Sequence, residues 1–179
     1  MTDPQPPRPS TGIPPLMRGG LILAAITIVA DQASKWLLQD MLLKQPVIEV
    51  IPGFFNLVMV WNRGISFGML GGAGAMPPWV LSAIAVAICV VLFLWLRAAR
   101  SRWTAWAIGL VIGGAIGNVV DRARWGAVFD FADFYIGRWH WPAFNVADSF
   151  ISIGVTLLLL QSLFAPAETS AESPVANKR

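Results

Sequence analysis

Cysteine and histidine are almost absent from this chain of 179 residues, which has one of each, Cys89 and His140. A single cysteine excludes a disulfide within the chain, and Cys89 lies among Ala, Ile and Val, as a small buried apolar residue would. A serine or cysteine triad would depend entirely on His140, and the G-x-S-x-G motif is missing. The common ligands of zinc are too few as well. The sequence therefore argues against the usual nucleophilic and zinc hydrolases.

Charge is also scarce, since 13% of the residues are charged and 56% are hydrophobic. The apolar residues form four runs, each near the roughly 20 residues needed to cross a bilayer core of about 30 Å. They lie at 19–38, 78–96, 103–120 and 149–165. A signal peptide is the alternative for the first run, but no small-residue cleavage site follows it. Composition predicts an all-α membrane protein with four transmembrane helices.

The short link between the second and third runs carries Arg97, Arg100 and Arg102 and no acidic residue. Because basic residues concentrate on the cytoplasmic side, this link and both termini are predicted to be cytoplasmic. Segments 39–77 and 121–146 would then lie outside, and the membrane domain would span 18–166. The polar tails, 1–17 and 167–179, are predicted to be disordered. The net charge of +3 follows from this topology, so no nucleic-acid partner is expected.

The first external segment has the pattern of a small sheet. Val47, Glu49 and Ile51 alternate with other residues, and a stretch rich in β-branched and aromatic residues, 54–61, follows Pro52-Gly53. We expect an extracytoplasmic β-sheet cradle that could shelter an extended substrate beside the bilayer.

The third run carries Gly109, Gly113 and Gly117 at spacings of four, which allows a neighbouring helix to approach closely. The fourth run has a polar line that begins near Asn145 and Asp148 and points toward protein or a water-filled cleft. That line comprises Asn145, Asp148, Ser149, Ser152 and Thr156.

Aspartates remain the candidate catalytic groups. Two carboxyl groups close enough to share a proton can activate water and polarise an amide carbonyl, which is peptide hydrolysis without a covalent intermediate. The candidates are Asp121, Asp130, Asp133 and Asp148. Spacing alone does not select the pair, and each could instead be a solvated acid, a helix cap or a ligand of Mg²⁺ or Ca²⁺.

Two further charged pairs are expected to support structure. Asp31 and Lys35 are spaced for a salt bridge within one helix, or for bracing the site, and Asp121 next to Arg122 suggests an orienting ion pair.

Five motifs, in this order, resemble those of the bacterial lipoprotein signal peptidases, also called signal peptidase II. They are DQASK at 31–35, NRGISF at 62–67, GNVVDR at 117–122, VFDF at 128–131 and FNVADS at 144–149. The resemblance implies a four-helix membrane peptidase that cuts prolipoproteins just before a diacylglyceryl-modified cysteine, at the outer face of the inner membrane. It implies no metal or organic cofactor.

The resemblance also assigns roles to individual residues. The family's catalytic dyad maps onto Asp130 and Asp148. Residues implied to hold the substrate or orient the dyad are Asn62, Asn118, Arg122 and Asn145, and those implied to support structure are Asp31, Lys35 and Asp121.

The expected partners are a lipidated prolipoprotein and membrane lipid, and the chain is expected to be a monomer. Two other classes stay open from the residues alone. A small proton-coupled transporter could use intramembrane carboxylates, although no repeat is visible. A non-catalytic scaffold could be built on the glycine-rich third run.

Overall fold

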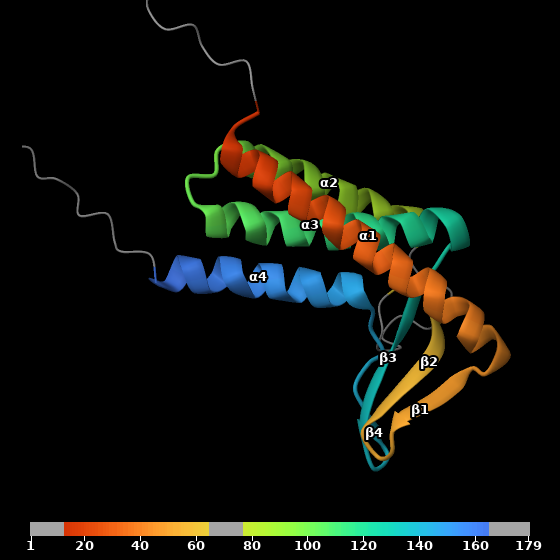
Figure 1. Cartoon of the computed structure of the whole chain (residues 1–179). Helices are drawn as coiled ribbons and strands as arrows, with labels where there is room; N and C mark the ends of the chain where they lie inside the picture. Colours follow the sequence, from red (N-terminus) through yellow and green to blue (C-terminus); the bar gives the residue numbers. More distant parts are fainter. Residues whose placement is uncertain (1–12, 65–76, 165–179) are drawn as a thin grey trace, which may run out of the picture.

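The computed structural model describes residues 13–64 and 77–164. It contains four helices that are long and apolar enough to cross a membrane, which confirms the predicted helix count. They are α1 (Pro15–Lys44), α2 (Pro78–Arg97), α3 (Arg102–Trp125) and α4 (Val146–Phe164), drawn in Figure 1.

All four helices extend beyond the predicted apolar runs, α2 by a single residue. Helix α1 continues to Lys44, where an exposed Lys44–Asp40 ion pair of 3.1 Å supports its last turn. Helix α3 continues to Trp125 and ends at Gly126, whose φ of 69° is a left-handed conformation that glycine adopts readily. Helix α4 starts at Val146. Hydrophobicity located the membrane segments but not the polar turns beyond them.

Helix α3 packs against each of the other three helices. A Cβ at Gly113 would lie 2.6 Å from the Ala24 oxygen of α1, and a Cβ at Gly117 would lie 2.6 Å from Asp31 Oδ2. On the other side, the helices approach at Gly154 of α4, where a Cβ would lie 2.7 Å from the Ala107 oxygen. The predicted packing role of the glycines in α3 is confirmed.

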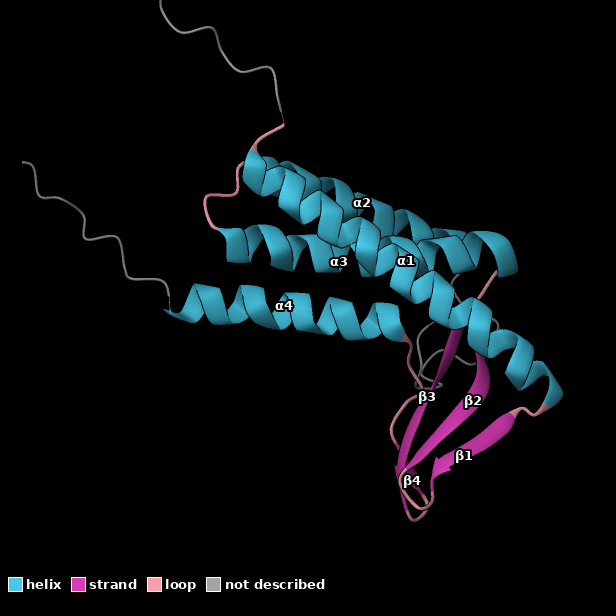
Figure 2. Ribbon diagram, viewed as in Figure 1, coloured by secondary structure: helices cyan, strands magenta, loops and turns pink. Residues whose placement is uncertain are grey.

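A four-stranded antiparallel sheet lies beyond one end of the bundle (Figure 2). Its strands, in spatial order, are β1 (Val47–Ile51), β2 (Phe55–Asn62), β3 (Val128–Ile136) and β4 (Trp139–His140). The sheet projects sideways relative to the helices, and the α2–α3 link lies at the opposite end of the bundle (Figure 1). The predicted small sheet is confirmed, and its position outside the membrane stays a prediction.

The sheet is fixed to the bundle by an apolar cluster that joins the end of α1 to β3. Its fully buried members include Leu42 and Phe129, and the Phe129 ring lies 5.3 Å from that of Trp61 on β2. Because side chains alternate along a strand, Phe129 and Phe131 point to one face of β3 and Asp130 points to the other. Packing of the phenylalanines therefore determines where Asp130 points.

Candidate active site

Asp130 is a nearly fully buried carboxylic acid on β3, with 1% of its surface exposed. One oxygen accepts a hydrogen bond of 2.7 Å from the Asn145 side-chain amide, and the other accepts one of 3.0 Å from the Asn62 amide. Asn62 is the last residue of β2, so two neighbouring strands and the start of α4 meet at this carboxyl group. All three residues were predicted site residues.

Asp148 lies in the first turn of α4. The Asn145 side-chain oxygen accepts from the Asp148 backbone N–H at 3.0 Å, and the Asp148 carboxylate accepts from the Asn145 backbone N–H at 3.2 Å. This is a reciprocal cap at a helix N-terminus. The Asn118 amide of α3 donates to the other Asp148 oxygen at 2.8 Å. Asp148 is thus held by two amide donors, and one of them belongs to the residue that holds Asp130.

The two carboxyl groups interact electrostatically. Burial raises the pKa of Asp130 from 3.8 to about 6, and repulsion from Asp148 adds to the rise, while hydrogen bonds from Asn62 and Asn145 oppose it. Asp130 therefore carries its proton in about half of the molecules near pH 6 and in most of them at lower pH. A protonated and an ionised carboxyl group side by side can act as acid and base.

Lys35 is the centre of a second, buried cluster next to this pair. Its ammonium group lies 2.9 Å from Asp31 and 2.7 Å from Asp121, and it donates to the Asn118 side-chain oxygen at 3.1 Å. All three ammonium hydrogens thus have acceptors. The salt bridge within α1 is confirmed. Lys35 also links α1 to α3, because it contacts Asp121 and Asn118, and the Asn118 amide donates to Asp148.

The carboxylates of this cluster also hold backbone groups. Asp31 accepts from the Ala147 N–H at 3.0 Å, at the start of α4, and Asp121 accepts from the Phe129 N–H at 3.1 Å, on β3. Ala147 and Phe129 are the chain neighbours of Asp148 and Asp130. The cluster therefore positions the backbone on which both aspartates are carried.

Arg122 does not pair with Asp121 as expected, because Asp121 is bound by Lys35. Its guanidinium donates a long hydrogen bond of 3.4 Å to the Asn118 backbone oxygen, and its buried Nε has no hydrogen-bond partner among the described residues. The group interacts electrostatically with Asp148, Asp130 and Asp121. Arg122 therefore places positive charge beside both candidate catalytic groups, and its Nε is a donor that no described residue uses.

Asp133, the fourth candidate acid, interacts with other side chains of the sheet and not with Asp130 or Asp148 in any contact that the structure records. It contacts His140 Nδ1 at 2.9 Å and accepts from the Asn56 amide at 3.1 Å. Within the described part of the chain, no three His, Cys, Asp or Glu residues are grouped so that they could hold a metal ion.

One residue in the cluster was not singled out from the sequence. Gln32 donates to Asp121 at 2.9 Å and to the Gly117 backbone oxygen at 3.2 Å. Gln32 is the second residue of the DQASK motif, and this position was the signal in the sequence that could have identified it.

Beyond its first turn, the polar line expected on α4 does not pack against protein. Asn145 precedes the helix as its cap, and the Ser149 hydroxyl donates to the Asn145 backbone oxygen at 3.0 Å. Ser152 and Thr156 are exposed, whereas Ala147 and Gly154 are the buried residues of α4. Helix α4 packs against its neighbours through small residues, and Ser152 and Thr156 do not take part in that packing.

Comparison with known proteins places these features in a family. The model of the family described as signal peptidase (SPase) II matches residues 23–164. A lipoprotein signal peptidase of Methylorubrum extorquens is 45% identical over 162 residues, which is 89% of this chain and 93% of that protein. One of Aeromonas hydrophila is 48% identical over 143 residues, or 78% and 85% of the two chains.

Solved structures agree with this assignment. One described as a bacterial membrane enzyme matches with a TM-score of 0.69 and 27% identity, over 86% of this chain and 93% of the other. A second, with the same description, has a TM-score of 0.69 and 29% identity, over 82% and 94%. The chain belongs to the signal peptidase II family of membrane proteases.

Proposed function

We propose that this chain is an aspartic endopeptidase that removes the signal peptide from diacylglyceryl-modified prolipoproteins, cutting just before the lipidated cysteine. Asp130 and Asp148 are the proposed catalytic pair. The observation that carries the proposal is that the Asn145 side chain holds both of them, next to a buried ion cluster and within a chain of the signal peptidase II family. Family membership does not favour the transporter alternative.

Asp130 serves as the acid in this proposal, because burial raises its pKa to about 6. Asp148 serves as the base, since the N-terminal end of a helix stabilises negative charge. Asp148 accepts a proton from water as the water oxygen attacks the carbonyl carbon, and Asp130 donates its proton toward the carbonyl oxygen. When the tetrahedral intermediate collapses, Asp148 gives its proton to the leaving amine and Asp130 recovers the proton from the hydroxyl group.

The other polar residues have supporting roles. Arg122 has a buried donor without a partner among the described residues, so its guanidinium is suited to bind a substrate carbonyl oxygen. Asn62, Asn118 and Asn145 orient the two carboxyl groups. Lys35, Asp31 and Asp121 join α1 to α3 behind them.

The pair is proposed to act at the outer face of the bacterial inner membrane, with both termini in the cytoplasm. The sheet, which carries Asp130 on β3, and the start of α4, which carries Asp148, lie at the end of the bundle opposite the α2–α3 link (Figure 1). Arg97, Arg100 and Arg102 lie in or beside that link. Basic residues favour the cytoplasmic side. A lipid-anchored cysteine would bring the scissile bond to this interface, where docking is effectively intramolecular. We propose that the protein acts as a monomer, in contact with membrane lipid and without a metal or organic cofactor.

The test is to incubate the purified protein with a lipidated precursor and with the same precursor lacking the lipid, and to map the products by mass. We expect a single cut just before the cysteine, in the lipidated precursor alone. Equal cleavage of both precursors would contradict the proposed substrate, and no cleavage of either would contradict the proposed activity.

A further inference from the structure

Tryptophan and arginine side chains gather where α3 ends beside the sheet. Trp125 is the last residue of α3, and its ring lies 6.0 Å from that of Trp61, near the end of β2. The Arg124 guanidinium lies 5.3 Å from the centre of the Trp125 ring, which is a cation–π contact. A cavity of about 230 Å³ beside these rings is lined by Trp61, Trp125, Ala127 and Arg63. Two arginines therefore border the same indole ring, that of Trp125, which is 51% exposed.

The positive charge of Arg63 and Arg124 is not balanced by the chain. Within the described residues, no arginine forms an ion pair with a carboxylate. The carboxylate nearest in the fold to Arg124, that of Asp121, is already held by Lys35 at 2.7 Å and by the Phe129 N–H at 3.1 Å. Two like charges beside one ring repel each other, and an anion between them would remove that repulsion. The arginines are therefore arranged for a negative charge that comes from another molecule.

This cluster lies at the level where the helices leave the apolar core of the membrane. The apolar run of α3 ends at residue 120 and that of α1 at residue 38, so Trp125 and Trp36 both lie close to such an end. Trp36 is 78% exposed and lines a second, small cavity of about 30 Å³ together with Gln39, Arg124 and Trp125. Tryptophan is enriched at the depth of the lipid headgroups. Interfacial aromatic rings and unbalanced positive charge therefore occur together at that depth.

The cluster is separate from the proposed catalytic pair. Trp61 and Phe129 are paired across β2 and β3, and their rings lie 5.3 Å apart on one face of the sheet. The next residue of each strand, Asn62 and Asp130, points to the other face, where the Asn62 amide donates to Asp130 at 3.0 Å. A ligand beside Trp61 and Trp125 would therefore lie behind the sheet, on the face opposite the two aspartates.

We propose that the cluster of Arg63, Arg124 and Trp125 binds the headgroup of an anionic phospholipid of the membrane. A phosphate group without a cation of its own supplies the missing negative charge, and guanidinium groups bind phosphate oxygens through paired hydrogen bonds. In a zwitterionic headgroup an ammonium group already balances the phosphate, so the arginines gain less from it. The acyl chains lie along the exposed apolar side of α1, which includes Val29 and Leu37. This site for a membrane lipid does not depend on the proposed function.

The test measures which lipid lies beside Trp125. The purified protein is placed in phosphatidylcholine vesicles that contain a small share of brominated phosphatidylglycerol or, in a parallel sample, of brominated phosphatidylcholine, because bromine quenches the fluorescence of a tryptophan that it contacts. The difference between the parent and Trp125→Phe gives the fluorescence of Trp125 alone. We expect phosphatidylglycerol to bind beside Trp125 about tenfold more tightly than phosphatidylcholine at low salt. Added salt should reduce this preference, because it screens the attraction between arginine and phosphate.

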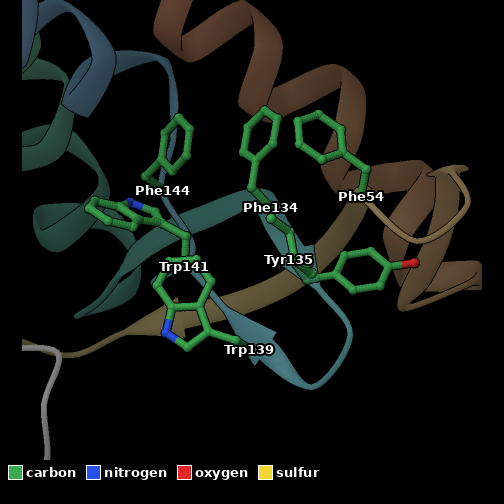
Figure 3. A pocket seen from close by; sticks show the side chains of 7 residues that line it. Phe54, Phe134, Tyr135, Trp139, Trp141 and Phe144 are labelled. Atoms are coloured by element: carbon green, nitrogen blue, oxygen red, sulfur yellow. The ribbon is translucent and has the colours of Figure 1, made fainter.

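Variants of the two arginines locate the preference. The double variant Arg63→Gln, Arg124→Gln, measured with and without Trp125→Phe, should bind both lipids almost equally. The double variant Arg63→Lys, Arg124→Lys keeps the charge but not the paired donors, so it should retain part of the preference. Trp141 is the matched control, because it lies at the other end of the sheet in an aromatic cavity that has no charged lining residue (Figure 3). Its fluorescence, obtained with Trp141→Phe, should show no preference.

Three results would overturn the lipid site. The first is equal quenching of Trp125 by the two brominated lipids in the parent. The second is a preference for phosphatidylglycerol that survives in the glutamine double variant, and the third is the same preference at Trp141. The last two would show that the preference comes from the net positive charge of the protein and not from this cluster. Cleavage of a precursor does not enter the measurement, so each result leaves the proposed function as it stands.

Discussion

Asn145 and Asp148 cap one another at the start of α4, and the same Asn145 amide donates to Asp130 at 2.7 Å. A single neutral side chain thus sets the position of both proposed catalytic groups. A carboxamide suits this place, because it has an acceptor for the Asp148 backbone and donors for Asp130.

Replacing Asn145 with alanine is therefore expected to affect both catalysis and stability. The change removes a helix cap and leaves the buried Asp130 with fewer donors, which costs about 1–3 kcal/mol of unfolding free energy. Misplacement of the pair should lower kcat about 100-fold. Kinetics on a lipidated precursor and thermal unfolding in detergent check both effects.

The control for this change is Asn56→Ala. It also removes a buried amide that donates to an aspartate, Asp133, but on the sheet away from the pair. It should lower stability and leave kcat nearly unchanged. Equal losses of kcat in the two variants would show that Asn145 has no special part in catalysis.

Replacing either proposed catalytic aspartate with asparagine should abolish cleavage. Asp130→Asn and Asp148→Asn keep the side-chain shape but cannot exchange a proton, so kcat/KM should fall about 1,000-fold or more. Product mass after a long incubation measures the residual activity, and circular dichroism confirms the fold. Asp40→Asn, at an exposed acid on α1, is the control and should match the parent. Parental activity in either site variant would exclude that residue from the chemistry.

Activity should fall as the pH rises through about 6. Burial raises the pKa of Asp130 to about 6, and the proposed mechanism requires its proton. Above this pH the acid is ionised in a growing fraction of molecules, and kcat/KM should decrease by up to tenfold for each unit. A rise in kcat/KM over this range, measured on the lipidated precursor, would instead assign the base to Asp130.

The same shift changes stability with pH. Because the folded-state pKa lies above the ordinary 3.8, the folded protein binds the proton more tightly than the unfolded chain does. The contribution of Asp130 to the free energy of unfolding is therefore complete below about pH 4 and is lost between about pH 4 and 6, an effect on the order of 3 kcal/mol. The stability difference between Asp130→Asn and the parent should shift in favour of the variant over this range. A difference independent of pH would contradict the raised pKa.

Lys35→Ala should destabilise the protein strongly. It leaves Asp31 and Asp121 buried without their cation, for which the loss is about 3–5 kcal/mol. Activity should fall with stability and recover in part when the protein is assayed at lower temperature. The chain offers a matched control in Lys44→Ala, which breaks an ion pair of the same spacing on the same helix, but an exposed one. That change should cost less than about 1 kcal/mol.

Gly113→Ala should weaken the packing of α1 on α3. Its Cβ would lie 2.6 Å from the Ala24 backbone oxygen, which cannot move without shifting the helix. A destabilisation of about 1–3 kcal/mol is expected from this overpacking. Gly19→Ala on α1 is the control, because its Cβ would meet only Trp106 Nε1, at 3.6 Å. Thermal unfolding in detergent compares them, and equal melting temperatures would contradict the close approach.

The sequence predicted the helices well because membrane spans need long apolar runs, and these are read directly from composition. It did not predict β3 and β4. Val128 through Ala132 are buried irrespective of the face they occupy, so the alternation that identifies a half-exposed strand is missing. The later Tyr135–His140 pairing depends on a turn that hydrophobicity does not reveal.

The pairing of the acids shows the same limit. Spacing gave the Asp31–Lys35 pair, which lies within one helix. The Lys35–Asp121 contact joins two helices, and the Asp133–His140 contact joins two strands, so both depend on tertiary packing. Separating Asp130 and Asp148 from the other acids therefore required either the fold or the family resemblance.

The links from Asp31 to the Ala147 N–H and from Asp121 to the Phe129 N–H have a consequence for biosynthesis. Asp31 in α1 accepts from Ala147, which follows it by 116 residues, whereas Asp121 in α3 accepts from Phe129, only eight residues further along the chain. Until α4 is in place, Asp31 lacks the Ala147 N–H and Asp148 has no fixed position, whereas Lys35 already has its acceptors on α1 and α3. The proposed active site is thus complete only when the segment that carries Asn145 and Asp148 has joined the first three helices.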